Sequence, residues 1–167
     1  MISAHPAPQK ATEPVDPFEP AFREAMAWVV QQRIPFNIVL GVRIVSLAPD
    51  APRLRFDMKP ELVGNFDTGQ LHGGVIAAVL DVMAGYALML RIAMKHLDDP
   101  VRQRMMRFAK LGTIDLRIDY LRPAKGAWFD ATGSVMRLGS RVGSTRMELC
   151  DDQGHLVATG NASFIVS

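Results

Sequence analysis

One carboxylate interrupts an apolar stretch that begins with two glycines, over residues 71–81 of the 167-residue chain. The run reads LHGGVIAAVLD, so that Asp81 follows a helix-forming segment of Val, Ile, Ala and Leu. A carboxylate among such side chains is costly to bury unless it is paired or used, and a desolvated carboxylate is a stronger base. Its helical neighbours at three and four residues are all small, namely Ala77, Ala78, Ala84 and Gly85. Asp81 is therefore the first candidate catalytic group, and a structural carboxylate that caps a partner's backbone is the alternative.

The two glycines near the start of this run form the second candidate site. Gly73 and Gly74 open the predicted helix, where the missing side chains allow a ligand to approach the backbone closely. The first amides of a helix have no partner within it, and the helix dipole favours negative charge there. His72-Gly73-Gly74 is therefore predicted to bind a developing oxyanion, with an ordinary loop-to-helix turn as the alternative.

Composition and spacing argue against several other functions. The formal net charge of +2 is too small to indicate a nucleic-acid partner. The four histidines have no paired spacing, and the single cysteine, Cys150, makes neither an internal disulfide nor a thiolate cluster. We therefore expect no bound metal and a reducing, cytoplasmic location. The sequence contains no phosphate loop or Gly-x-Ser-x-Gly elbow, and we expect no cofactor.

The chain is expected to form a single folded domain over residues 18–167, after a flexible, proline-rich leader over residues 1–17. Residues 75–94 are apolar and long enough to imitate a membrane span. However, Asp81 lies inside this segment, and the strand-like segments that follow it need a surface to pack on. We therefore predict a buried core helix and no membrane span.

Hydrophobic periodicity predicts the order helix, two strands, one long helix and four strands. Helices are expected over residues 18–33 and 74–94, and strands over residues 40–47, 54–58, 114–120, 128–138, 142–150 and 156–166. Residues 60–71 are expected to form a loop, and the basic segment 97–110 a connector that is mobile from residue 102 onward. Because the long helix is apolar nearly all round, we predict an α+β fold in which a curved antiparallel sheet wraps around it.

Several of these residues together resemble the hotdog-fold acyl-CoA thioesterases. The resemblance lies in Asn65, Gly69, Leu71 to Gly74, Asp81 nine positions after His72, Thr113 to Leu116 and Tyr120 to Ala124. It covers residues 36–166 and is nearest to the phenylacetate-pathway type, shared with the small human thioesterase superfamily members. It implies a hotdog fold, hydrolysis of acyl-CoA thioesters, and a homodimer or homotetramer whose sites lie between subunits.

The resemblance also implies roles for the matching residues. Asp81 of one subunit would be the general base or the nucleophile, and the Gly73 N–H of the other would bind the thioester carbonyl. Asn65 would contact that carbonyl or the attacking water, although it lies seven residues before His72 where six is usual, which makes Asp67 a rival. An Asn that only forms a turn is the alternative. His72 would hold the loop by hydrogen bonds.

Thr113 would orient the water, but strand alternation places it on the same face as Asp115, so that a bulge near Gly112 is required. The residues implied in substrate binding are His72, Gly74, Arg122, Arg137, Ser140 and Arg141, the three arginines for the phosphates of coenzyme A. Solvated surface charge is the alternative for each arginine. The acyl chain would run along the apolar helix, whose methionines suit irregular ligands or simply fill the core. A non-catalytic acyl-CoA-binding protein and a hotdog hydratase, which needs an Asp–His pair, are the alternative functions.

Overall fold

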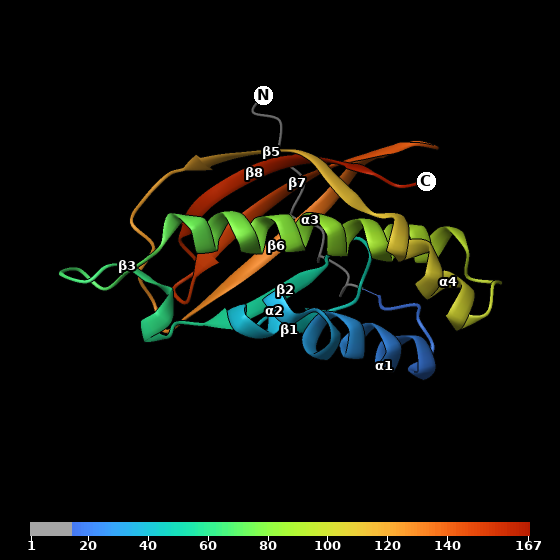
Figure 1. Ribbon diagram of the computed structural model, residues 1–167, viewed down its shortest axis with the longest axis horizontal. Helices are drawn as coiled ribbons and strands as arrows, with labels where there is room; N and C mark the ends of the chain where they lie inside the picture. The colour runs from blue at the N-terminus through green and yellow to red at the C-terminus, as the bar shows by residue number, and fades with distance from the viewer. Residues whose placement is uncertain (1–14) are drawn as a thin grey trace, which may run out of the picture.

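A 23-residue helix, α3 (Gly73–Lys95), runs along one face of a six-stranded sheet (Figure 1). The computed structural model describes residues 15–167, so most of the predicted leader lies outside the described residues. Twelve residues of α3 are buried, among them Val79, Leu80 and Met83. By length and composition α3 could cross a membrane, but 61% of its most apolar window is buried inside the protein. This burial is what a core helix requires.

The sheet is antiparallel throughout, and its strand order is β1-β2-β6-β7-β8-β5. Its strands are β1 (Arg43–Ser46), β2 (Arg53–Asp57), β5 (Gly112–Tyr120), β6 (Trp128–Leu138), β7 (Val142–Asp151) and β8 (Leu156–Ile165). All six predicted strands are found, with ends that differ by a few residues. The α+β fold of a curved antiparallel sheet around one long helix is confirmed.

Three short helical elements precede the sheet: α1 (Pro20–Trp28), the π-helical turn η1 (Val29–Arg33) and α2 (Pro35–Leu40). The helix predicted over residues 18–33 is present as α1 and η1, with Phe22, Met26 and Val30 buried. The strand expected from residue 40 is wrong at its start, because Pro35 begins a new helical turn instead. That turn ends at Gly41, whose φ of 74° is the left-handed conformation of a helix C-cap, and β1 follows it.

The predicted loop over residues 60–71 contains a short hairpin. A single 3-10 turn, η2 (Pro60–Leu62), leads into β3 (Val63–Asn65), which pairs with β4 (Gln70–Leu71). Figure 1 shows this hairpin extending away from the body of the molecule, beyond the first turn of α3. The hairpin therefore carries Asn65 away from the sheet and the core.

The segment 97–110 is mostly helical, which corrects the prediction of an irregular connector, while its mobility remains a prediction. It forms α4 (Val101–Arg107) and the 3-10 turn η3 (Phe108–Lys110). Arg104 is 1% exposed, forms an ion pair with Glu19 at the start of α1, and lies 4.8 Å from the ring of Phe22. The basic composition suggested a solvated loop, but the guanidinium is paired and its stem packs on an aromatic ring.

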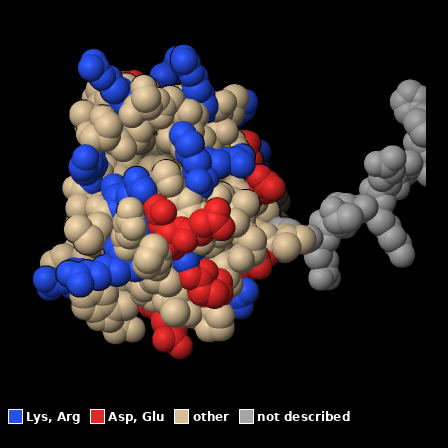
Figure 2. Space-filling model, turned by 90° about the vertical axis from the view of Figure 1, so that its right-hand side faces the viewer, with Lys and Arg blue, Asp and Glu red and all other residues tan. Residues whose placement is uncertain are grey.

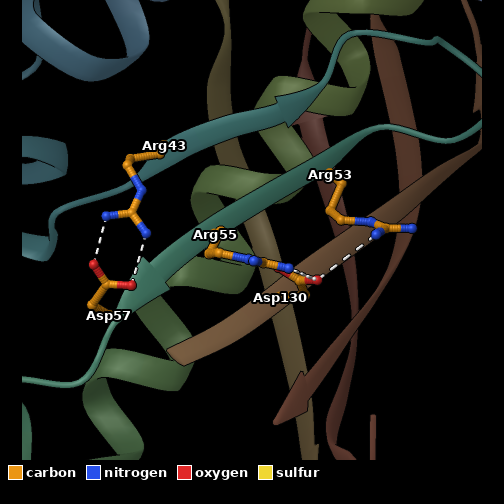
Figure 3. A network of polar contacts seen from close by, with 5 residues as sticks. All are labelled: Arg43, Arg53, Arg55, Asp57 and Asp130. Atoms are coloured by element: carbon orange, nitrogen blue, oxygen red, sulfur yellow. Dashed lines mark hydrogen bonds and ion pairs between the residues drawn. The ribbon is translucent and has the colours of Figure 1, made fainter. Parts of the chain in front are cut away.

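Charged side chains alternate along β2 and pair with neighbouring strands on the face of the sheet opposite α3 (Figure 3). Arg55 donates hydrogen bonds of 2.7 and 2.9 Å to Asp130 of β6 and lies 3.6 Å from the ring centre of Trp128. Arg43 of β1 binds Asp57 of β2, and this hydrogen bond lowers the pKa of Asp57. These pairs join β1, β2 and β6 in a fixed register, so the charges of this face have a structural role.

Candidate active site

Asp81 and Thr113 are brought together although 32 positions separate them in the chain. The Thr113 Oγ1 donates a hydrogen bond of 2.8 Å to the Asp81 Oδ1. A bulge in β5 makes this contact possible, because Thr113 pairs with Phe164 and Asp115 with the adjacent Ser163, which leaves Ile114 unpaired. The expected bulge is therefore present, one or two residues later than Gly112. Its effect is to orient the carboxylate of Asp81, which is half-buried in α3.

His72 is the N-cap residue of α3. Its Nδ1 accepts a hydrogen bond of 2.9 Å from the Gly74 N–H, as the side chain of an N-cap residue does. The Gly74 amide is thereby occupied, whereas the Gly73 N–H has no hydrogen-bond partner among residues 15–167. This geometry leaves Gly73 as the donor available to an oxyanion. It also gives His72 a backbone partner in place of the carboxylate that a hydratase would need.

Tyr120 is a contact that the sequence did not single out. Its hydroxyl donates a hydrogen bond of 3.0 Å to the carbonyl oxygen of Gly73, which ties the last residue of β5 to the first turn of α3. The only sequence signal was its position at the start of the Tyr-Leu-Arg-Pro-Ala segment. The Gly73–Gly74 peptide group is thus held at its oxygen by Tyr120 and at its N–H by His72, which fixes the start of the helix against the sheet.

Asn65 lies in the exposed hairpin and turns its side chain onto its own loop. Its Oδ1 accepts hydrogen bonds from the backbone of Asp67 at 3.0 Å and of Thr68 at 3.2 Å. Asp67 is exposed in the same turn. Within one subunit the structure therefore brings neither residue to the Asp81–Thr113 pair, and Asn65 has the geometry of a turn residue.

The two ends of the candidate site are too far apart to act on one carbonyl group within a single subunit. Gly73 and Asp81 are eight residues apart on one helix, which at 1.5 Å per residue is a separation of about 12 Å. A thioester carbonyl that accepts a hydrogen bond from Gly73 is thus out of reach of the Asp81 of the same chain. Gly73 and Asp81 of one chain therefore do not form one complete site.

A cavity of about 370 Å³ opens beside Asp81. Its lining is mostly apolar and comes from η1, α2, α3, η3, β5 and β8, with the residues Val30, Ile34, Phe36, Asn37, Asp81, Val82, Gly85, Tyr86, Met89, Phe108, Leu111, Gly112, Thr113 and Phe164. Of the methionines of α3, Met89 lines this cavity, whereas Met83 is buried in the core. The size and lining are those of a site for an apolar group.

The candidate phosphate-binding residues lie at two ends of the molecule. Ser140 lines a cavity of about 490 Å³ together with basic side chains of α3, α4 and η3, namely Lys95, His96, Arg107 and Lys110. Figure 2 views this end and shows Lys and Arg side chains over much of its upper part. Arg137 and Arg141 flank the same β6–β7 turn, and both are exposed.

Arg122 lies at the opposite end of the sheet. Its backbone N–H donates a hydrogen bond to the carbonyl of Val157, whereas the carbonyl of Arg141 accepts one from the N–H of Val166. Val157 and Val166 are nine residues apart, which separates the two arginines by about 30 Å of extended chain. Within one subunit these arginines do not form one site. Among the described residues, no group of three or more His, Cys, Asp or Glu side chains is placed to hold a metal ion.

Known proteins resemble this chain in sequence. The family model described as "Thioesterase superfamily" matches residues 68–158. The chain is 40% identical, over 136 residues, to the medium/long-chain acyl-CoA thioesterase YigI of Escherichia coli K12, an alignment that covers 80% of this chain and 86% of that protein.

Solved structures show the same fold. A Shewanella oneidensis protein related to the thioesterase superfamily superposes with a TM-score of 0.81 at 40% identity, covering 90% of this chain and all of that one. Mouse thioesterase superfamily member 2 superposes with a TM-score of 0.66 at 22% identity, over 86% of this chain and 96% of that one, and shares the fold.

Proposed function

Because the chain belongs to the thioesterase superfamily, we propose that it hydrolyses acyl-CoA thioesters to a free acid and coenzyme A. The observation that carries this proposal is the pair formed by Asp81 and Thr113 at the mouth of an apolar cavity. The carboxylate is held at one oxygen by the hydroxyl, and its second oxygen is left for a water molecule. The lone cysteine and the bacterial relatives favour a cytoplasmic location.

The active site is completed by a second copy of the chain. β5 is an edge strand, and among the described residues it pairs only with β8. Near the start of β5, Thr113 contacts Asp81, and at its end Tyr120 contacts Gly73. If two β5 strands pair antiparallel about a two-fold axis, the start of each lies opposite the end of the other. This pairing supplies the Asp81 of one subunit to the Gly73 of the other.

The reaction follows from these positions. The thioester carbonyl accepts a hydrogen bond from the Gly73 N–H at the positive end of α3, which stabilises the negative charge that develops on its oxygen. Asp81 removes a proton from water as the water attacks the carbonyl carbon, and Thr113 keeps the carboxylate oriented. The carbon–sulfur bond then breaks, and coenzyme A leaves as a thiolate. Direct attack by Asp81, with hydrolysis of the resulting anhydride, uses the same geometry.

The two-fold arrangement also groups the residues implied in binding coenzyme A. Arg122 follows β5 at the end that carries Tyr120, whereas the β6–β7 turn with Ser140 and Arg141 lies at the end where β5 begins. Antiparallel pairing of β5 places Arg122 of one subunit at the same end as the β6–β7 turn of the other. Together with Arg137, these groups supply the cations that two or three phosphates require.

The apolar cavity beside Asp81 is the proposed acyl site. It has no charged lining residue apart from Asp81 itself. An apolar lining of this kind, and the medium/long-chain activity named for the Escherichia coli relative, favour a medium or long acyl chain as the substrate.

A mixed dimer tests whether the site is shared. Gly73→Pro removes the N–H at the first position of α3, where proline fits, and His72 already has the extended backbone that proline requires of its predecessor. A Cβ at this position lies 3.5 Å from the Tyr120 ring, an ordinary contact. Asp81→Asn removes the carboxylate from the other half. Each variant alone is expected to lose turnover of a panel of acyl-CoAs, measured by release of free thiol.

The mixed dimer, purified with two different affinity tags, contains one doubly altered site and one intact site. It is expected to recover about half of the wild-type activity, because the intact site uses Gly73 from one chain and Asp81 from the other. A mixed dimer as inactive as its parents would place both groups in one subunit and contradict the proposal. A wild-type protein that binds acyl-CoA without releasing thiol would instead be the non-catalytic binding protein.

A further inference from the structure

We propose that Phe108 of η3 forms the far end of the acyl cavity and thereby sets the longest acyl chain that the protein hydrolyses. The inference rests on the proposed function and deepens it, because it assigns the specificity of the same site to one residue. It is drawn from the position of Phe108 between the apolar cavity beside Asp81 and the second cavity, whose lining contains basic side chains.

The apolar cavity runs along α3 away from the reacting groups. Asp81 and Thr113 line one part of it, and Met89 lies eight residues further along the helix, about 12 Å from Asp81. Gly85 lies between them and adds no side chain to the lining, where a Cβ would contact the ring of Phe164 at 3.5 Å. A chain whose carbonyl carbon lies at Asp81 therefore extends toward Met89 and Phe108.

Phe108 has rigid support on its far side. Its ring meets the ring of Phe22 edge to face, with 6.5 Å between the ring centres, and Phe22 in turn contacts Phe18 at 4.4 Å. Phe22 is fully buried and is covered by the guanidinium of Arg104, which is paired with Glu19. This aromatic stack cannot move aside without breaking the contacts between α1 and α4, so it stops a chain where it meets Phe108.

Two residues close to Phe108 in the sequence line the second cavity and not the apolar one. Arg107 and Lys110, in the same turn of chain, line the second cavity with Lys95 and Ser140. The Arg107 guanidinium is held by Asp99 at 2.6 Å. Beyond Phe108 an acyl chain would meet the basic side chains that share the lining of this second cavity with Ile92, Met106, Leu138 and Val166, so the burial of further methylene groups is less favourable there than in the first cavity. Phe108 is thus the boundary between the part that suits the chain and the part that does not.

The test is the length profile of kcat/KM for saturated, straight-chain acyl-CoAs. In Phe108→Ala, the first chains that are too long for the wild type are expected to gain on the order of tenfold in kcat/KM, while the shortest substrates keep their kcat. Leu97→Ala is the matched control, because it removes an exposed apolar side chain between α3 and α4 that lines neither cavity, and its profile should equal the wild type.

Two further variants guard against loss of folding in Phe108→Ala. Phe108→Leu keeps a large apolar residue and is expected to shift the limit by less in the same direction. Gly85→Ala adds a Cβ that meets Phe164 at 3.5 Å, an ordinary contact, and narrows the cavity, so the limit should shift to shorter chains. Melting temperatures identify any variant that has unfolded.

The outcomes are distinguishable. Wild-type hydrolysis with the same length profile in Phe108→Leu and in folded Phe108→Ala would overturn this inference and leave the proposed function intact. Absence of hydrolysis for every acyl-CoA in the wild type would overturn the proposed function, and the inference with it.

Discussion

The hydroxyl of Thr113 reaches the carboxylate of Asp81, at 2.8 Å, across the boundary between the edge strand β5 and the central helix α3. A neutral donor at this distance holds the ionised form of the carboxylate in one orientation. A general base needs such an orientation to receive a proton from a water molecule on a defined path. The pair is therefore the natural starting point for testing the proposed chemistry.

Asp81→Asn should lower kcat by about 10²- to 10⁴-fold, the range for loss of a positioned general base. The variant keeps the size of the side chain and can still accept the hydrogen bond from Thr113, so it should fold and bind acyl-CoA. Asp98→Asn, an exposed change in the turn after α3, is the control and should have wild-type turnover. A folded Asp81→Asn variant with near-normal turnover would exclude the carboxylate from the reaction, whereas a collapsed melting temperature would indicate a structural role.

Thr113→Val removes the donor and keeps the shape of the side chain. We expect kcat to fall roughly 10- to 100-fold, which corresponds to loss of one hydrogen bond to a charged group. Thr113→Ser restores the hydroxyl and should recover most of the activity. Equal activity in the two variants would mean that the 2.8 Å contact does not position Asp81 during turnover.

His72 should behave as a helix cap rather than as a proton carrier. His72→Ala removes the acceptor for the Gly74 N–H and should destabilise the protein by about 0.5–2 kcal/mol, with weaker substrate binding because the loop is disturbed. His72→Asn supplies another good N-cap acceptor and should recover both stability and turnover. An asparagine variant that folds normally but is inactive would show that the imidazole itself takes part in the chemistry.

The ion pair between Glu19 and Arg104 should control the order of α4. Glu19→Gln removes the counter-charge of a buried guanidinium, whose Nε and Nη1 have no hydrogen-bond partner among residues 15–167. Because Glu19 is partly exposed, we expect a loss of only about 1–3 kcal/mol, together with faster amide exchange in α4. Glu24→Gln, an exposed change on α1, is the control. Fast exchange of α4 already in the wild type would restore the mobile connector expected from composition.

The carboxylate of Asp151 should make the free energy of unfolding depend on pH in the acid range. Burial disfavours its charged form, but hydrogen bonds from the backbone and ring of His155 and from the Gln153 N–H outweigh this and lower its pKa. Because its pKa is lowered in the folded state, the Asp151 carboxylate stabilises the fold fully above its unfolded pKa of about 3.9, and this stabilisation is lost as the pH falls below that value.

The check on Asp151 is the free energy of unfolding between neutral and acid pH. Asp151→Asn should be less stable than the wild type near pH 7, and the difference should shrink as pH falls through the folded pKa. Asp98→Asn, which changes an exposed carboxylate in the turn after α3, should leave the pH dependence unaltered. A difference between Asp151→Asn and wild type that stays constant down to pH 2 would contradict the assignment.

The sequence by itself determined the elements whose pattern is local. The long apolar run fixes α3 as a core helix, because a helix that is apolar nearly all round must be covered, and alternation fixes the strands. His72, Gly73 and Asp81 could also be identified, since a cap, an unpaired amide and a lone carboxylate have meaning within a single helix. The resemblance to thioesterases used these same residues.

Only the tertiary structure decided which residues meet across elements. The bulge at Ile114 that turns Thr113 toward Asp81, and the contact of Tyr120 with Gly73, depend on strand register, which no single segment specifies. The order of α4 depends on a partner for Arg104 that lies 85 residues earlier in the chain, so its basic composition was misleading. The proposal that two subunits share the site likewise rests on the length of α3 and the position of β5 at the sheet edge, which are properties of the folded chain.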